Sequence, residues 1–189
     1  MKELWIDTET TGTDPQRHAI VQIAGIIVVP GREDFTFNLT LKPFDGDAIE
    51  DAALAVTGLS RETIAAYADP FAVKEVLEQV FAPVVRKFDR SDKFIMLGYN
   101  ALFDYNFLHR LWAKCGDRYF GSWVHFPPID VMNLAAHHLA SQRHTLANFK
   151  LATVAAHCGL TPEGDLHDAL TDIRLTRALY HTLSKEKQS

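Results

Sequence analysis

The first third of the chain carries the continuous or alternating hydrophobic patterns that are typical of β-strands. We expect a short buried strand over residues 3–7, and a second one over residues 19–29, which are apolar and rich in β-branched side chains. Pro30 and Gly31 predict a turn. Clean alternation over residues 34–42 then predicts a third, half-buried strand, and the three segments together form a meander.

From residue 70 onward the hydrophobic positions change to the spacing of amphipathic helices. Eight apolar residues between Val73 and Phe88 follow that spacing, which predicts one helix through this stretch. A short buried strand over 94–97 and a helix over 101–114 come next. Further helices are expected near 130–140, 147–158 and 168–183, and residues 43–68 are expected to be irregular with short helical pieces. Strands that then alternate with helices predict an α/β protein with a mixed sheet.

Length and composition indicate one globular domain over residues 1–189, with 47% hydrophobic and 23% charged residues. No apolar run approaches the ~20 residues of a membrane span, and the start of the chain has no signal-peptide pattern. The two cysteines, Cys115 and Cys158, are isolated. We therefore expect a cytoplasmic protein with reduced thiols.

The net charge of -5 argues mildly against a nucleic-acid partner, because proteins that bind nucleic acid are usually basic. That argument weakens if several of the acids hold divalent cations, since the metal ions then determine the local field. Net charge therefore does not exclude a nuclease.

Two carboxylates, Asp7 and Glu9, close the first apolar run. Strand alternation places them on one face of the sheet. Two carboxylates about 5 Å apart repel by roughly 3 kcal/mol at an effective dielectric near 20, so the pair suits a divalent metal; two exposed acids are the alternative. Thr10, Thr11 and Gly12 follow as a polar turn, whose glycine would allow close approach of a ligand.

Two further acids lie on the apolar faces of predicted helices. Asp104 shares the inward face of its helix with Phe107 and Leu108; the alternative is an acid favoured by the helix dipole. Asn100 is the expected cap of that helix. Asp172 lies on the inward side of the last helix, where an acid paired with an arginine is the alternative.

The start of the last helix carries two more candidates. Asp168 is the natural cap of this helix. His167, directly before it, becomes a candidate base because Asp172, five residues on, would bring it to the metals. An ordinary loop histidine is the alternative.

Together these motifs resemble the DEDDh family of 3'-to-5' exonucleases, the DnaQ-like group of the RNase T and proofreading type. The matching segments are Asp7-Thr8-Glu9-Thr10-Thr11-Gly12; Asn100-Ala101-Leu102-Phe103-Asp104 with Phe107-Leu108; and His167-Asp168-Ala169 with Asp172. The chain departs from the family pattern at Thr57 and at Tyr99, where the family has or often has a histidine.

The resemblance implies an RNase H-like fold, a five-stranded mixed sheet flanked by helices. It also implies that Asp7, Glu9, Asp104 and Asp172 hold two Mg²⁺ or Mn²⁺ ions, and that His167 takes a proton from the attacking water. The expected enzyme is a metal-dependent 3'-5' exonuclease, a phosphodiester hydrolase that releases 5'-mononucleotides from single-stranded DNA or RNA or from 3' overhangs.

The expected partner is nucleic acid with a free 3' end, with no membrane involved; a homodimer stays open. Substrate contacts are expected from the backbone of the polar turn and from three residues of the second motif: Thr10, Thr11, Gly12, Asn100, Phe103 and Phe107. Phe103 and Phe107 are candidates to stack on bases, and core packing is the equal or better interpretation for both.

Three other functions are weighed against this one. The first is an RNase H-like endonuclease, which the His167–Asp172 and Asn100–Asp104 motifs disfavour. The second is a non-catalytic nucleic-acid-binding module, in which loss of an acid or of the histidine is expected; none is lost. The third is a zinc site, for which no pair has the spacing of a known closed site among His137, His138, His144, His157 and Cys158.

Overall fold

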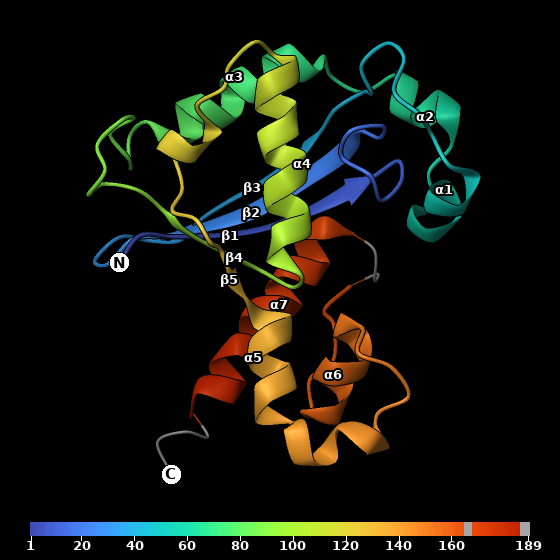
Figure 1. Ribbon diagram of the computed structural model, residues 1–189, viewed down its shortest axis with the longest axis vertical. Helices are drawn as coiled ribbons and strands as arrows, with labels where there is room; N and C mark the ends of the chain where they lie inside the picture. Colours follow the sequence, from blue (N-terminus) through green and yellow to red (C-terminus); the bar gives the residue numbers. More distant parts are fainter. Residues whose placement is uncertain (165–167, 186–189) are drawn as a thin grey trace.

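A five-stranded mixed sheet separates two layers of helices (Figure 1). The computed structural model describes residues 1–164 and 168–185. The strands are β1 (Glu3–Thr10), β2 (Ile20–Val28), β3 (Phe35–Thr40), β4 (Ile95–Gly98) and β5 (Ile129–Asp130). Their order in the sheet is β3-β2-β1-β4-β5. β1, β2 and β3 pair antiparallel, as the predicted meander requires, whereas β4 runs parallel to β1 and to β5.

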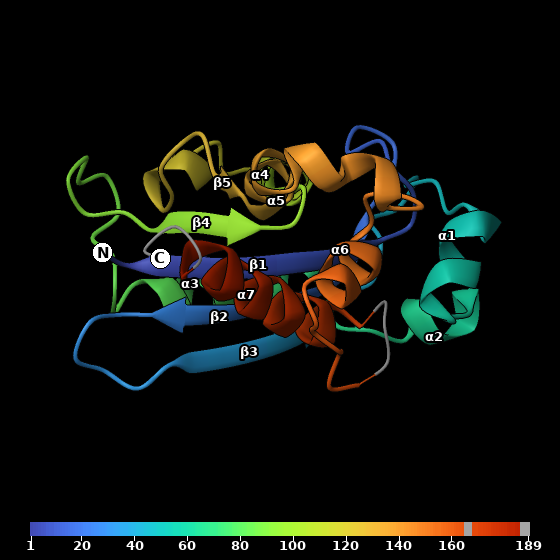
Figure 2. The ribbon, with the colours of Figure 1, turned by 90° about the horizontal axis from the view of Figure 1, so that it is seen from below.

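The helices cover both faces of the sheet. They are α1 (Asp51–Thr57), α2 (Arg61–Ala65), α3 (Pro70–Phe81), α4 (Ala101–Lys114), α5 (Val131–His138), α6 (Leu151–His157) and α7 (Ala169–Lys185), with short 3-10 turns at Phe120–Ser122 and Ala140–Thr145. Figure 2 shows α7 crossing one face of the sheet, beside α5 and α6, with α3 behind the sheet. Within the described residues, no helix is long and apolar enough to cross a membrane.

Alternation along β1 builds the two cores. Leu4 and Ile6 point to one face and pack with α3 and α4, while Trp5 points to the other and packs with α5, α6 and α7. All three side chains are fully buried. Because both faces of β1 are covered, its apolar run is continuous rather than half polar.

Most predicted elements differ from the structure by a few residues at their ends, and two of these differences matter for the site or the fold. The first strand continues past residue 7 to Thr10, so Asp7 and Glu9 lie within β1 rather than beyond the sheet, opposite Ala24 and Gln22 of β2. The helix predicted up to Phe88 ends at Phe81, with Ala82 as its C-cap. Pro83 explains this ending, because proline lacks the backbone N–H and its ring clashes with the carbonyl four residues earlier.

The parallel pairing of β1, β4 and β5 fixes the place of the chemistry. Parallel strands end at the same edge of a sheet, so α4 and α5 begin beside the end of β1. A Cβ at Gly98, the last residue of β4, would lie 2.9 Å from the carbonyl oxygen of Ile6. The backbone of β4 therefore passes close to β1 at this point, immediately before the chain turns into α4.

Candidate active site

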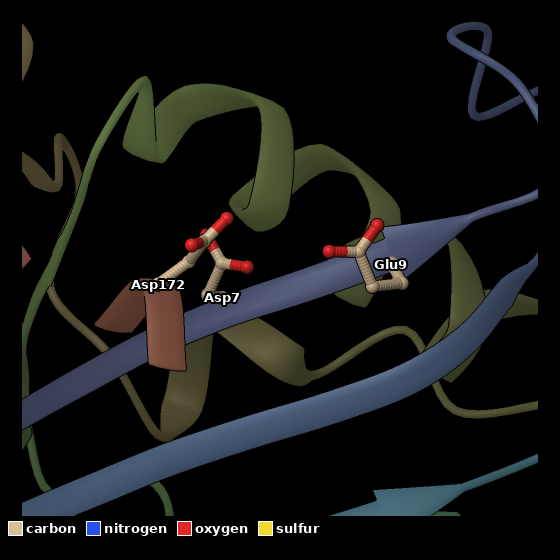
Figure 3. Close-up of side chains that lie close together, drawn as sticks. All are labelled: Asp7, Glu9 and Asp172. Atoms are coloured by element: carbon tan, nitrogen blue, oxygen red, sulfur yellow. The ribbon is translucent and has the colours of Figure 1, made fainter. Parts of the chain in front are cut away.

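Three carboxylates from two elements meet at the end of β1. Oxygen atoms of Asp7, Glu9 and Asp172 all lie within 4.8 Å of one another, and each side chain is partly buried. Figure 3 shows Asp7 and Glu9 on β1, with Asp172 reaching toward Asp7 from α7. Residues 165 positions apart in the sequence are thus joined in one site, as the motifs predict.

Asp104 approaches the same strand from the other layer. It is 3% exposed in the first turn of α4, and its Oδ1 accepts a hydrogen bond of 2.8 Å from the Thr8 hydroxyl. Thr8 points to the face opposite Asp7 because side chains alternate along β1. Asp104 is outside the 4.8 Å group of the described residues, but its charge acts on both β1 acids.

The start of α7 is tied to the sheet by Asp168 and Gln22. Asp168 caps the helix as predicted, since its Oδ2 accepts from the Thr171 backbone N–H at 3.1 Å. Its Oδ1 accepts from the Gln22 side-chain amide at 2.7 Å. Gln22 pairs with Glu9 across the β1–β2 ladder, so this contact holds Asp172, one helical turn later, against β1.

Crowding raises the pKa values of the acids. Burial raises the pKa of Asp7 well above its ordinary value, and the charges of Asp104, Glu9, Asp172 and Asp168 raise it further. Burial followed by Asp172 and Asp104 raises the pKa of Glu9 to about 8. Burial also raises the pKa of Asp104 to about 7, although hydrogen bonds from Thr8 and the backbone oppose this shift. Without a metal ion, the protein therefore favours the protonated form of these carboxylates.

A divalent cation fits this set of donors. Oxygen atoms on opposite sides of a Mg²⁺ ion are about 4 Å apart, since each lies at 2.0–2.1 Å from the metal. The 4.8 Å limit of the Asp7, Glu9 and Asp172 group is compatible with that span. Carboxylates are hard ligands of the type that Mg²⁺ and Mn²⁺ prefer. The predicted zinc alternative gains no support, because the histidines and Cys158 form no such group within residues 1–164 and 168–185.

The predicted ligand contacts of the Thr10–Gly12 turn are partly wrong. The backbone N–H of Thr11 donates to Ala19, its carbonyl accepts from the Glu50 N–H, and its side chain is fully buried. Thr11 is therefore used inside the protein. Gly12 is required by His18, since a Cβ there would lie 2.5 Å from the imidazole ring. Close packing against His18 thus requires this glycine, whatever ligand the groove receives.

An open groove of about 290 Å³ adjoins the acids. It is lined by Glu9, Thr10, Gly12, Thr13, Glu50, Ala52, Ala53, Val56 and Thr57. Thr57, one of the two departures from the family pattern, thus lies beside the site. Its hydroxyl faces the carbonyls of Ala53 and Leu54 in its own helix, at 3.3 Å each. Two other residues of the groove, Glu50 and Thr13, belong to no motif and were not predicted as site residues.

The second motif has mixed outcomes. Phe107 is 2% exposed in the core beneath α4, so it offers no face to a base, and of the two interpretations core packing is confirmed. Phe103 is partly buried, with its ring 4.7 Å from that of Phe107. Asn100 precedes α4 at φ 62° without a side-chain cap, contrary to expectation, and its N–H donates to Asp130. Tyr99, the other departure, donates to the Phe149 carbonyl at 2.9 Å.

His167, the predicted general base, lies outside the described residues. The described chain resumes at Asp168, whose backbone carbonyl accepts from the Asp172 N–H at 3.0 Å. The role of His167 therefore stays a prediction.

Residues 4–180 match the RNase_T family, described as an exonuclease family. Ribonuclease T of Marinobacter nauticus is 27% identical over 163 residues, which cover 80% of this chain and 72% of that protein. The PolC-type DNA polymerase III of Thermotoga maritima is 30% identical over 175 residues, which cover 93% of this chain but 11% of the polymerase.

Solved structures of exonuclease I share the fold. E. coli exonuclease I in complex with a dT13 oligonucleotide superposes with a TM-score of 0.77 at 22% identity. The superposition covers 99% of this chain and 41% of exonuclease I. This likeness confirms the predicted RNase H-like architecture of a five-stranded mixed sheet flanked by helices.

Metal-free protein should lose stability as the pH rises from about 6.5 to about 8.5. The folded-state pKa values of Asp7, Glu9 and Asp104 are raised, so the folded state holds more protons than the unfolded state in this range, and the free energy of unfolding falls with pH. Thermal melts in EDTA test this. Mg²⁺ or Mn²⁺ should raise the melting temperature, increasingly so at higher pH, because the metals bind the ionised carboxylates.

The matched control is the Asp7→Asn, Glu9→Gln double variant. It keeps the shapes of both side chains. Its melting temperature in EDTA should depend less on pH, and Mg²⁺ or Mn²⁺ should no longer raise it. A melting temperature in EDTA that increases over the same range in the unmodified protein would contradict the assigned pKa directions.

Proposed function

The chain belongs to the exonuclease family, of the 3'-to-5' DEDDh type that its motifs indicate, and from this premise we propose its substrate and mechanism. We propose that it hydrolyses single-stranded nucleic acid, or a single-stranded 3' overhang, one nucleotide at a time from a free 3' end. The products are 5'-mononucleotides. The observation that carries this proposal is the meeting of Asp7, Glu9 and Asp172 within 4.8 Å beside an open groove.

We propose that these three residues and Asp104 hold two Mg²⁺ or Mn²⁺ ions. When bound, such ions polarise the scissile phosphate, lower the pKa of the attacking water and stabilise the leaving oxygen. Metal binding also offsets the repulsion that raises the carboxylate pKa values in the metal-free protein. The crowding that is unfavourable without a cation is thus the feature that makes the site selective for one.

The surrounding residues orient these ligands. Thr8 donates to Oδ1 of Asp104 and so holds that carboxylate against β1. Gln22 and Asp168 fix the first turn of α7, which keeps Asp172 at β1. His167 is proposed to accept the proton of the attacking water, because a neutral imidazole near physiological pH suits this role.

The groove is proposed to receive the terminal nucleotide. With its phosphate at the carboxylates, the adjoining sugar and base enter the space between the Thr10–Gly12 turn and α1. Apolar side chains there, Ala52, Ala53 and Val56, suit the face of a base or sugar. A strand that continued beyond this nucleotide would meet the turn, which favours attack at an end. Phe103 and Asn100, which do not line this groove, stay proposed substrate contacts from the second motif.

The geometry of the site does not distinguish DNA from RNA as the substrate. The named relatives include a ribonuclease and a DNA polymerase, so we propose both single-stranded DNA and RNA as substrates to compare.

We also propose that residues 1–189 act as one exonuclease domain in the cytoplasm. The homodimer that the sequence leaves open is a further proposal, which light scattering of the purified protein would test.

Asp7→Asn and Asp172→Asn should each abolish hydrolysis. Each variant removes one proposed ligand charge while keeping the shape of the side chain. The metal-free form of each should melt at the same temperature as the unmodified protein or slightly higher, because repulsion is relieved. Activity on a labelled oligonucleotide and thermal melts in EDTA measure the two effects. Glu62→Gln, an exposed acid on α2, is the control; near-full turnover by either Asp variant would place the site elsewhere.

His167→Ala should lower the single-turnover rate by about 10²–10⁴-fold, the range expected for a positioned general base. Metal binding, measured by the rise in melting temperature, should be largely kept. The rate of the unmodified enzyme should increase as the pH rises through the imidazole range near 6.5. If the variant has the same pH–rate profile, another group takes the proton.

Digestion should begin at a free 3' hydroxyl. A 5'-labelled single strand should shorten progressively, and a 3'-labelled one should release labelled 5'-mononucleotide first. Parallel reactions with DNA and RNA, with Mg²⁺ or Mn²⁺ and with EDTA, test polymer and metal together. A circular single strand is the control: efficient cutting of the circle would indicate an endonuclease, and binding without any hydrolysis would indicate a non-catalytic module.

A further inference from the structure

Residues 131–162, from the start of α5 to just past the end of α6, contain no aspartate or glutamate, although the chain has 24 such acids among its 189 residues. The cations and histidines of this acid-free segment are His137, His138, Arg143, His144, Lys150 and His157. Since the whole chain has a net charge of -5, the segment differs in sign from the rest of the protein. A surface with this distribution of charge attracts anions.

Two side chains of the acid-free segment present a permanent positive charge to solvent. Arg143 and Lys150 are both exposed, and no carboxylate of residues 1–164 and 168–185 forms an ion pair with either. The guanidinium of Arg143 lies over the ring of Phe149, 4.9 Å from its centroid. A guanidinium stacked on a ring keeps its in-plane N–H donors available for an anion, so this contact restrains Arg143 without neutralising it.

Two hydrogen bonds attach the acid-free segment to the catalytic edge of the sheet. The Tyr99 hydroxyl, directly after β4, donates to the Phe149 carbonyl at 2.9 Å. Asp130, the last residue of β5 and the N-cap of α5, accepts from the Asn100 backbone N–H at 3.0 Å. Because β4 and β5 run parallel to β1, both attachments lie at the edge where β1 carries its acids. The exposed cations are thereby held on the same side of the molecule as the chemistry.

The acid-free segment and the groove lie on different sides of the carboxylates. The groove adjoins β1 and α1, whereas the segment follows β4 and β5, which are beyond β1 in the strand order β3-β2-β1-β4-β5. Figure 1 shows α1 and α6 on opposite sides of the start of α7, the helix that carries Asp172. A strand that ends in the groove, with its scissile phosphate at the carboxylates, therefore continues toward the acid-free segment.

The part of the strand outside the groove needs a cationic surface. Each further nucleotide adds one phosphate charge, and the catalytic edge itself is acidic. Metal ions bound there would offset the acids at the scissile phosphate, but their field is largely screened beyond about 10 Å in ordinary buffers. Exposed arginine and lysine side chains bind phosphates by releasing their counterions, so Arg143 and Lys150 supply what the acids cannot.

We propose that Arg143 and Lys150 bind backbone phosphates of the strand on the 5' side of the scissile phosphate, and that the acid-free segment is the surface on which the enzyme holds its single strand. The inference rests on the proposed function, since the terminal nucleotide in the groove sets the direction of the strand. It assigns strand binding to residues outside the motifs and separates that binding from the chemistry at the acids.

The test compares two substrates that differ in their reach. One is a single-stranded oligonucleotide of about 12 nucleotides, within the site sizes of single-strand-binding folds. The other is the p-nitrophenyl ester of a nucleoside 5'-monophosphate, which has a scissile phosphodiester and no upstream phosphate. The test variant is Arg143→Gln, Lys150→Gln. The control variant is Arg90→Gln, Arg118→Gln, which removes two exposed cations from the loops before β4 and after α4.

The test variant should raise KM for the oligonucleotide by about 2- to 30-fold, the range for two exposed ion pairs, with kcat unchanged. The fall of log(kcat/KM) with log[salt] should become shallower by about 1.4, because each phosphate contact on a single strand contributes about 0.7. For the ester, kcat/KM should stay within about twofold of the unmodified enzyme. The control variant should match the unmodified enzyme on both substrates and in its salt dependence.

The failure of this inference is distinguishable from the failure of the proposed function. If the unmodified enzyme removes no nucleotide from either a DNA or an RNA strand, the proposed function is wrong. If it does, and the test variant keeps the KM and salt dependence of the unmodified enzyme, the acid-free segment does not hold the strand and serves another anionic partner. Equal losses on the oligonucleotide and the ester would also overturn the inference, because they would mean damage to the catalytic edge.

Discussion

Repulsion among carboxylates at the end of β1 is the constraint on which the site depends. Asp7, Glu9 and Asp172 are held within 4.8 Å of one another, and Asp104 adds its charge from the opposite layer. Burial and mutual repulsion raise the pKa values of both β1 acids. Such a cluster lowers the stability of the metal-free fold. A divalent cation bound among the carboxylates would offset this repulsion.

The sheet and its helices supply the rigidity that resists this repulsion. Leu4, Trp5 and Ile6, just before the acids, are fully buried between two helical layers. Gln22 on the neighbouring strand holds the cap of α7 through Asp168, so Asp172 cannot swing away from β1 without breaking that bond. Packing and hydrogen bonds around the site therefore offset the repulsion among the acids.

Contacts within the protein also shape the groove. The backbone groups and the hydroxyl of Thr11 form hydrogen bonds inside the protein, and Gly12 packs closely against the ring of His18. Thr11 therefore supports the groove from inside the protein, whereas Gly12 lies in its wall. The opposite wall of the groove is formed by Glu50 and by residues of α1, none of which belongs to a motif.

The sequence by itself determined the meander, the helix over 101–114, the cap at Asp168 and the membership of the acids in one family pattern, because these depend on local periodicity and residue type. It did not determine that Pro83 ends α3 early, since apolar spacing continues past the break. Nor did it determine that His18 and Glu50 meet. Those outcomes depend on contacts between residues far apart in the chain, such as the 3.1 Å approach of His18 to Glu50, and only the tertiary structure brings such residues together.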